Sequence, residues 1–365
     1  MASTLLAALP LLLGLVPVQG REVRSYRGYT FEAYLADFGK SYSEAAELAS
    51  RRATFEVNLA KVLLHNRKYA AGLEEWYMAV NKFADWTGEE FARLLSAKHS
   101  HNRALVAQLP KGKNPDSIDW RERGAVTEVK DQGGCGSCWA FAATETVESH
   151  YQIASGKLLK LAPQTYVDCV ENPDECGGTG GCEGATAELA FNLTVTKGVA
   201  LESDLPYSGH DEKCRAYGAA VKASGYVRNP PNDAEALETA LATKGPQSIT
   251  VAADAWMLYG GGVFSGCSKS HVSMSVTLDH GVQAVGYTKD AWIVRNSWGA
   301  DWGEKGYIRL SRASDGQTFV DKSPADGQAC KPYPKTQTVG GECGVLFDTS
   351  YPTGVEAAED RTLVV

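Results

Sequence analysis

The chain has 365 residues, of which 44% are hydrophobic and 22% are charged. These proportions are ordinary for a soluble globular protein, so they exclude a disordered chain, a collagen and a multi-span membrane protein. The formal net charge of −8 and the lack of any long run of Lys or Arg argue against a nucleic-acid partner. The length predicts about two or three compact units.

Residues 1–20 differ in composition from the rest of the chain. The stretch from Leu5 to Val18 is almost wholly apolar and is followed by Gly20, which predicts a secretory signal cleaved near Gly20. A membrane anchor is the alternative. It is disfavoured because the stretch is shorter than the roughly 20 residues of a spanning helix and is interrupted by Pro10 and Pro17.

Residues 21–112 contain no cysteine and are predicted to be helical. Ser41 and Glu44 form a possible capping box at the start of a helix that extends to about Asn66. Apolar residues at three- and four-residue spacing define one face of that helix: Leu48, Phe55, Leu59, Val62 and Leu63. The run is too short for a coiled coil, so this face needs a partner surface elsewhere in the chain.

Residues 97–115 lose this periodicity and are predicted to be an exposed, cleavable linker. Residues 21–112 have 14 basic and 11 acidic residues, hence a charge of +3, whereas residues 113–365 have 22 and 33, hence −11. The two pieces are therefore complementary in sign. We expect acid to weaken the electrostatic part of their contact.

Residues 113–365 change from helical to β-rich midway. Helices are predicted over residues 138–152 and 183–198. Short strands are predicted over residues 247–253, 281–288, 291–295 and 306–311. The sequence therefore predicts an α+β fold with a cleft between a helical subdomain and a sheet subdomain.

The most informative stretch is DQGGCGSCWAF, residues 131–141. Its glycines predict a tight loop that places Cys138 at the N-terminus of a helix, where the helix dipole favours the nucleophilic thiolate. His280 follows 142 residues later as a candidate base, and Asn296 offers an amide oxygen that could orient it. Gln132 is a candidate donor to an oxyanion, together with the backbone N–H of Cys138. This order and spacing are typical of a cysteine peptidase.

Other functions could be read from the same residues. Cys135-x-x-Cys138 alone could be a redox pair or half of a zinc site, but no second pair with ligand spacing follows. We therefore expect neither a metal nor a cofactor. A non-catalytic binder is the rival from another class. It would be favoured by loss of Cys138 or His280, and both are present.

At these motifs the chain resembles the papain-like cysteine peptidases of the cathepsin L type. In the front segment, six residues match the family's ERFNIN propeptide pattern, with Val in place of Ile: Glu47, Arg51, Phe55, Asn58, Val62 and Asn66. Asn81, Phe83 and Asp85 match its GNFD pattern, in which Ala79 replaces Gly. The resemblance implies that residues 21–112 are an autoinhibitory propeptide that blocks the cleft and that residues 113–365 are the peptidase domain.

The resemblance also implies roles for the nine cysteines, an odd number in which at least one thiol should stay unpaired or join two chains. It implies the pairs Cys135–Cys182, Cys169–Cys214 and Cys267–Cys343, and a thiol at Cys138. Cys176 and Cys330 are extra to the family pattern and could bridge each other. Composition alone does not decide among the pairings.

Substrate-binding residues are likewise implied by the resemblance, as follows: Gly184, Ala185, Ala187, Gly281, Trp298 and Asp348. Ala185 stands where a glycine backbone usually pairs with P2, the second substrate residue before the cleaved bond. Trp298 is expected to shield the contact between His280 and Asn296 from water. Asp348 is expected at the floor of the P2 pocket, where it would allow Arg or Lys at P2 beside hydrophobic P2 residues, although it could instead point to solvent.

Taken together, the sequence predicts a monomeric cysteine endopeptidase zymogen of the secretory pathway, either extracellular or directed to a lysosome or vacuole. Its expected partners are protein or peptide substrates, its own propeptide and cystatin-like inhibitors. No nucleic acid and no membrane span are expected.

Overall fold

The computed structural model describes residues 23–95, 105–269, 276–327, 329–358 and 363–364. The predicted signal segment lies outside these ranges. No helix in the described ranges is long and apolar enough to cross a membrane.

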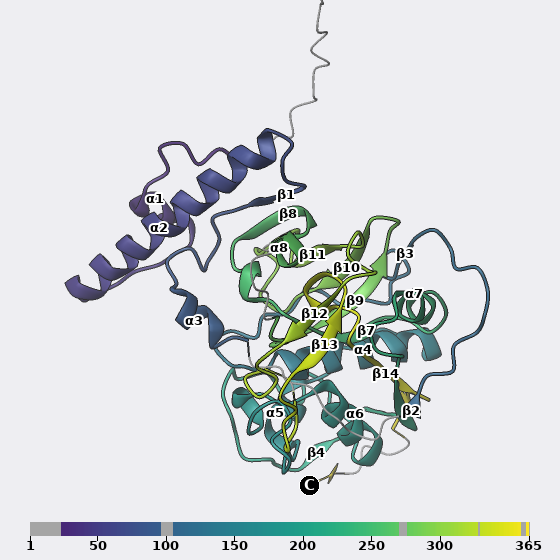
Figure 1. The fold of residues 1–365 in the computed structure, drawn as a ribbon. Helices are drawn as coiled ribbons and strands as arrows, with labels where there is room; N and C mark the ends of the chain where they lie inside the picture. The colour runs from purple at the N-terminus through teal and green to yellow at the C-terminus, as the bar shows by residue number, and fades with distance from the viewer. Residues whose placement is uncertain (1–22, 96–104, 270–275, 328, 359–362, 365) are drawn as a thin grey trace, which may run out of the picture.

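The front segment forms a small helical unit with its own apolar core. It contains α1 (Phe31–Asp37), α2 (Ala45–Ala70), β1 (Trp76–Met78) and α3 (Gly88–Ala92). Phe55 and Val62 on α2 are buried, and the Phe55 ring stacks on Tyr34 of α1 with ring centroids 4.8 Å apart. Figure 1 shows α2 as the long helix at the outer edge of the molecule.

The predicted capping box at Ser41 is wrong. Helix α2 begins at Ala45 after Glu44, whose side chain makes no capping hydrogen bond. The chain before it takes another course because Tyr42 donates a 2.5 Å hydrogen bond to buried Asp85. A true capping box lies at Thr87 and Glu90, at the start of α3.

The helical half of the following domain is built around α4 (Cys138–Ser155), which is accompanied by α5 (Pro163–Cys169), a 3-10 turn η1 (Gly181–Glu183) and α6 (Ala187–Thr196). Every residue of α4 from Cys138 to Tyr151 is buried. The buried Ser and Thr hydroxyl groups of α4 donate hydrogen bonds to backbone carbonyls one turn earlier in the helix. Thr144, for example, donates to Ala140 O at 2.7 Å. The helix predicted over 183–198 is shorter than expected, because Gly184 interrupts it with a φ of +93°.

The second half is a ten-stranded, mostly antiparallel sheet with the order β1-β8-β11-β10-β9-β7-β14-β6-β2, in which β3 also pairs with β9. Its bounds are β2 (Leu105–Val106), β3 (Ile118–Asp119), β6 (Gly225–Arg228), β7 (Gln247–Val251), β8 (Tyr259–Phe264), β9 (His280–Tyr287), β10 (Ala291–Arg295), β11 (Tyr307–Ser311) and β14 (Asp348–Thr353). The four predicted strands are thus present, with ends shifted by two residues at most.

The remaining elements are peripheral. They are β4 (Tyr217–Gly218), β5 (Val221–Lys222), α7 (Ala234–Thr243), η2 (Asp254–Trp256), α8 (Gly266–Lys269), β12 (Thr318–Asp321), β13 (Gln337–Gly340), η3 (Glu342–Gly344), β15 (Glu356–Ala357) and β16 (Leu363–Val364). Strands β12 and β13 form a separate hairpin, and β15 and β16 pair with β5 and β4.

Two apolar cores confirm the predicted α+β architecture. One is formed by α4, α5 and α6 and includes Phe191 and Tyr166. The other lies in the sheet half and includes Trp256 and Val294.

Helix α4 packs along β9, and Gln283 of β9 donates a 3.0 Å hydrogen bond to Ser149 Oγ of α4 (Figure 1). The loop before α4 meets the chain just after β10, where Gln132 N donates to Ser297 O at 2.9 Å.

Candidate active site

Cys138 is the first residue of α4 and is fully buried. All nine cysteines are in the described ranges; eight of them form four disulfides, and Cys138 keeps its thiol. The Cys135–Cys182 disulfide and a 3.0 Å hydrogen bond from Gly136 N to Cys182 O hold the loop before Cys138. The loop therefore presents Cys138 from a fixed backbone.

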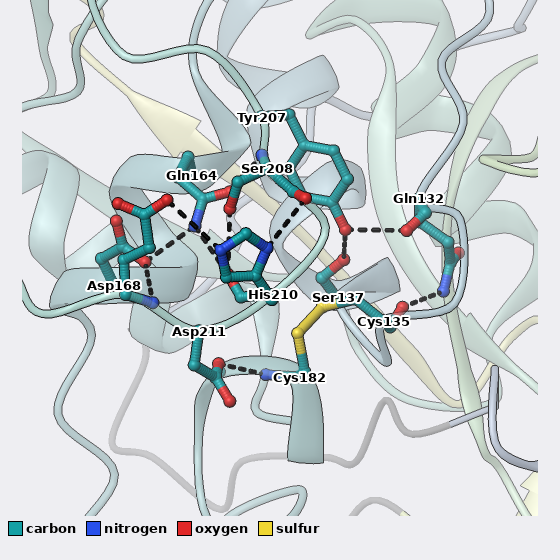
Figure 2. The surroundings of a disulfide bond; sticks show 12 residues. Gln132, Cys135, Ser137, Gln164, Asp168, Cys182, Tyr207, Ser208, His210 and Asp211 are labelled. Atoms are coloured by element: carbon teal, nitrogen blue, oxygen red, sulfur yellow. Dashed lines mark hydrogen bonds and ion pairs between the residues drawn. A yellow bond between two sulfur atoms is a disulfide. The ribbon is translucent and has the colours of Figure 1, made fainter.

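Tyr207 provides a second clamp on this loop. Its hydroxyl lies 2.7 Å from Ser137 Oγ and donates to Gln132 O at 2.8 Å (Figure 2). The hydroxyl of Ser137, which precedes α4, is thus directed to Tyr207 and does not cap the helix. Burial raises the pKa of Tyr207 to about 12, so it acts as a neutral hydrogen-bonding group.

His280 and Asn296 face each other at the ends of two neighbouring strands inside the sheet. His280 begins β9 and Asn296 follows the last residue of β10, and these two antiparallel strands are neighbours. His280 Nε2 lies 2.8 Å from Asn296 Oδ1, and both side chains are fully buried.

The backbone fixes the tautomer of His280. Asn296 Oδ1 also accepts the N–H of Ser297 at 2.8 Å, which identifies this atom as the amide oxygen. His280 Nε2 must then donate, so the neutral ring carries its unprotonated nitrogen at Nδ1. Nδ1 is buried and has no hydrogen-bond partner among the residues that the structure describes. His280 is therefore set up to accept a proton at Nδ1.

Burial lowers the pKa of His280 to about 4, against the opposing effect of its hydrogen bond to Asn296. The indole of Trp298 stacks on the imidazole, with ring centroids 4.7 Å apart and planes 26° apart. Trp298 is itself 1% exposed. Its position over the ring agrees with the expected shielding of the His280–Asn296 contact.

Gln132 is buried beside the loop that carries Cys138. Its Oε1 accepts a 2.6 Å hydrogen bond from Ser297, and its Nε2 donates to Cys135 O at 3.0 Å and to Leu94 O at 3.2 Å. Leu94 belongs to the front segment. The amide that is a candidate for holding an oxyanion is thus engaged by a carbonyl of the front segment.

Further contacts fasten the front segment over the site. Strand β1 pairs with β8 in the antiparallel sense, and Asn81 Nδ2 donates to Met257 O at 2.8 Å. The rings of Phe83 and Phe91 meet Trp298 edge-on, with centroids 5.8 and 5.0 Å away. The front segment therefore packs on Trp298, whose indole in turn packs on His280.

The predicted substrate-binding residues fall on both halves of the domain. Gly184 and Ala185 are buried beside η1, Ala187 opens α6, and Gly281 lies next to His280 in β9. Ala185 is not among the described residues with a positive φ, so its methyl group is accommodated without backbone strain.

Asp348 is 3% exposed and already has partners. Its Oδ1 accepts a 3.0 Å charged hydrogen bond from Arg228 Nη2, and its Oδ2 accepts one of 2.8 Å from Thr250. Glu188 lies close enough to interact with this pair. Burial, with the negative charge of Asp348, raises the pKa of Glu188 above its usual range. Asp348 thus belongs to a buried cluster and does not point to solvent.

The disulfides are Cys135–Cys182, Cys169–Cys214, Cys267–Cys343 and Cys176–Cys330. The first three are the pairs that the resemblance implies, and the fourth joins the two extra cysteines. Four disulfides are consistent with the secretory pathway.

Known proteins match the chain over both of its parts. Residues 114–327 match the papain family cysteine protease model, and residues 31–91 match the cathepsin propeptide inhibitor domain (I29). The chain belongs to the papain family of cysteine proteases and is a zymogen with an inhibitory propeptide.

Individual relatives agree with this assignment. A cathepsin L-like proteinase of Phaedon cochleariae is 38% identical over 302 residues, which cover 79% of this chain and 90% of the relative. Cathepsin S of Bos taurus is 36% identical, with coverages of 79% and 88%. The solved structure of digestive procathepsin L 3 from Tenebrio molitor larval midgut has a TM-score of 0.74 at 31% identity and covers 88% of this chain and 97% of its own.

Several residues of the site were not identified from the sequence. Ser297 orients Gln132 and could have been suspected because it follows Asn296 directly. Tyr207, Arg228 and Leu94 lie outside the motifs. Only the folded chain brings them to the site.

Proposed function

We propose that this papain-family peptidase is a cysteine endopeptidase in which Cys138 is the nucleophile, His280 the proton carrier, Asn296 the group that orients His280, and Gln132 an oxyanion donor. The observation that carries this assignment is the Asn296–His280 contact. This contact supports the proposal because it keeps the proton of the neutral imidazole on Nε2, so that Nδ1 can accept the proton of a thiol.

The reaction follows from these roles. The thiol proton of Cys138 passes to His280 Nδ1, and Sγ attacks the substrate carbonyl carbon to form a tetrahedral oxyanion, which accepts a hydrogen bond from Gln132 Nε2. Collapse breaks the C–N bond as His280 protonates the leaving amine, which leaves a thioester. Water then attacks the thioester while His280 takes its proton and returns it to the departing thiolate, so that an acid product is released and the thiol is restored.

The proposed boundaries are a signal at residues 1–20, a propeptide at 21–112 and a peptidase domain at 113–365. Propeptide removal would take the Leu94 carbonyl away from Gln132. Acid is proposed to favour this step, because the two parts carry charges of opposite sign. The ion pair between Lys82 and Asp131, 2.5 Å long and partly exposed, joins them at the site.

The proposed setting is extracellular or a lysosome or vacuole. Protein or peptide substrates are the partners of the mature enzyme, which we propose to be a monomer. Cystatin-like inhibitors are proposed as partners that occupy the same cleft.

The test is a Cys138→Ser variant of the full chain, with its propeptide removed by another protease as in the wild type. We expect hydrolysis of a peptide substrate to fall by about 10³-fold or more, with an unchanged circular dichroism spectrum. Undiminished hydrolysis by a correctly folded variant would overturn the assignment of Cys138.

A further inference from the structure

The loop at residues 170–181 is joined to the sheet half of the domain by a disulfide. Cys176 in this loop pairs with Cys330, which lies 154 residues later in the segment between β12 and β13. We define the clasp as residues 174–178 and 329–333.

Polar contacts reinforce the disulfide of the clasp. Lys331 N donates to Asp174 O at 2.9 Å, and Lys331 Nζ forms a 2.5 Å ion pair with Glu175. The Tyr333 hydroxyl donates to Glu175 O at 3.4 Å. The clasp is therefore a built connection of several bonds, with Cys176 and Cys330 only 5% and 9% exposed.

On the helical half, the clasp presses against the backbone that precedes α6. A Cβ placed on Gly178 would lie 1.8 Å from Glu183 O, and one on Gly177 would lie 2.6 Å from Ala185 O. Only glycine allows this approach. The clasp thus lies directly against the Glu183–Ala185 backbone, which includes the residue expected to pair with P2.

On the sheet half, the segment that leads into the clasp lies against the backbone before His280. A Cβ placed on Gly327 would lie 2.8 Å from Leu278 O and 2.9 Å from Thr277 Cγ2. Leu278 is two residues before His280. The clasp thus lies beside the Glu183–Ala185 backbone, and the segment that precedes it in the chain lies beside the backbone that leads to His280.

We propose that the clasp closes the cleft beyond the P2 position, so that substrate residues N-terminal to P3 are obstructed. The inference rests on the proposed function, because it takes Cys138 as the nucleophile and Ala185 as the P2 contact. The clasp would restrict which peptide bonds the enzyme cleaves. Bonds close to the N-terminus of a substrate should be cleaved faster than bonds deep inside a chain.

The test is a series of fluorogenic peptides with the same P2 and P1 residues and an N-terminus at P3, P4 or P5, assayed with the processed enzyme. We expect kcat/KM to fall about tenfold from the P3-ending to the P5-ending peptide in the wild type. In the double variant Cys176→Ser/Cys330→Ser the fall should be less than about twofold. Lys335→Ala, an exposed residue just outside the clasp whose replacement keeps the disulfide and the contacts of the clasp, is the matched control and should behave as the wild type.

Each preparation is first titrated with a thiol-directed epoxide. Absence of labelling at Cys138 would contradict the proposed function itself. Normal labelling with a flat series in the wild type would overturn the clasp proposal alone. That result needs no variant, so the proposal can be refuted even if the double variant fails to fold.

Discussion

At the scale of single residues, the site depends on amide side chains whose oxygen and nitrogen atoms bind different partners. Gln132 is the clearest case, because Ser297 holds its oxygen while its nitrogen is directed to Leu94 O and Cys135 O. Ser297 thus fixes which end of the amide faces the cleft. When the propeptide leaves, Nε2 loses one acceptor and keeps its orientation.

Replacing Gln132 with Ala should therefore impair catalysis more than substrate binding. We expect kcat of the processed enzyme to fall about 10²–10³-fold with a small change in KM, because the donor acts mainly on the oxyanion of the transition state. Steady-state kinetics normalised by epoxide titration measure this. A change confined to KM would contradict the role given to Gln132.

Asp348 leads to a prediction about substrate choice. Its carboxylate would have to be shared between Arg228 and a basic P2 residue, so the preference for P2 Arg should be modest. We expect Asp348→Asn to lower kcat/KM for a P2-Arg peptide relative to a P2-Leu peptide by about fivefold or less. Equal ratios in the wild type and the variant would count against a P2 role for Asp348.

The sequence was informative about the residues of the candidate site but not about all of their partners. Cys138, His280, Asn296 and Gln132 stand in motifs with characteristic spacing. The fold joins His280 to Asn296 and, through Ser297, brings Gln132 of the loop before Cys138 beside them. Arg228 could not be connected with Asp348, because 120 residues separate them and neither stands in a motif with the other. Long-range pairing of this kind depends on strand register, here of β6 with β14.

At the scale of elements, helix and strand positions followed from periodicity, whereas helix starts did not. The Ser41–Glu44 pattern satisfied a capping rule, yet α2 begins later because Tyr42 is held by Asp85, 43 residues away in sequence. Tertiary contacts overrode a local preference there. The strand pairing of β1 with β8, which fastens the propeptide, had no signal in the sequence at all.

Trp76 in β1 should be a main anchor of the propeptide. It is 5% exposed and its ring lies 4.6 Å from Phe264 and 3.9 Å from His65, measured between centroids. Trp76→Ala should weaken propeptide docking by about 3–5 kcal/mol. The epoxide should then label Cys138 of the intact zymogen at neutral pH much faster.

The matched control is Leu73→Ala. Leu73 lies three residues earlier and is 71% exposed, so its loss should leave the labelling rate unchanged. Equal rates for the two variants would contradict the anchoring role of Trp76.

At the scale of the whole molecule, the two halves of the peptidase domain meet at buried charges. Glu145 of α4 lies 3.5 Å from Arg295 of β10, and these side chains are 1% and 0% exposed. Burial raises the pKa of Glu145 to about 7, although Arg295 and Lys130 act in the opposite direction. Glu145, at the interface between the halves, therefore keeps its proton to a higher pH than an exposed glutamate does.

This raised pKa has a defined effect on stability. Between about pH 4.5 and 7 the unfolded chain releases a proton from Glu145 that the folded protein retains, so the free energy of unfolding decreases as pH rises through this window. The decrease due to this group is about 3 kcal/mol. Glu145→Gln should remove it, which urea unfolding of the zymogen at pH 5 and pH 7 can measure. Parallel pH profiles for the wild type and the variant would contradict a raised pKa of Glu145.

We propose that the propeptide covers a reactive Cys138. The most direct measurement is mass spectrometry of the zymogen before and after incubation at about pH 4.5, where carboxylates begin to protonate, with a thiol-directed epoxide present. We expect loss of the front segment, with a new N-terminus near residue 113, and a single label on Cys138. No label on Cys138, even after another protease has removed the front segment, would contradict it.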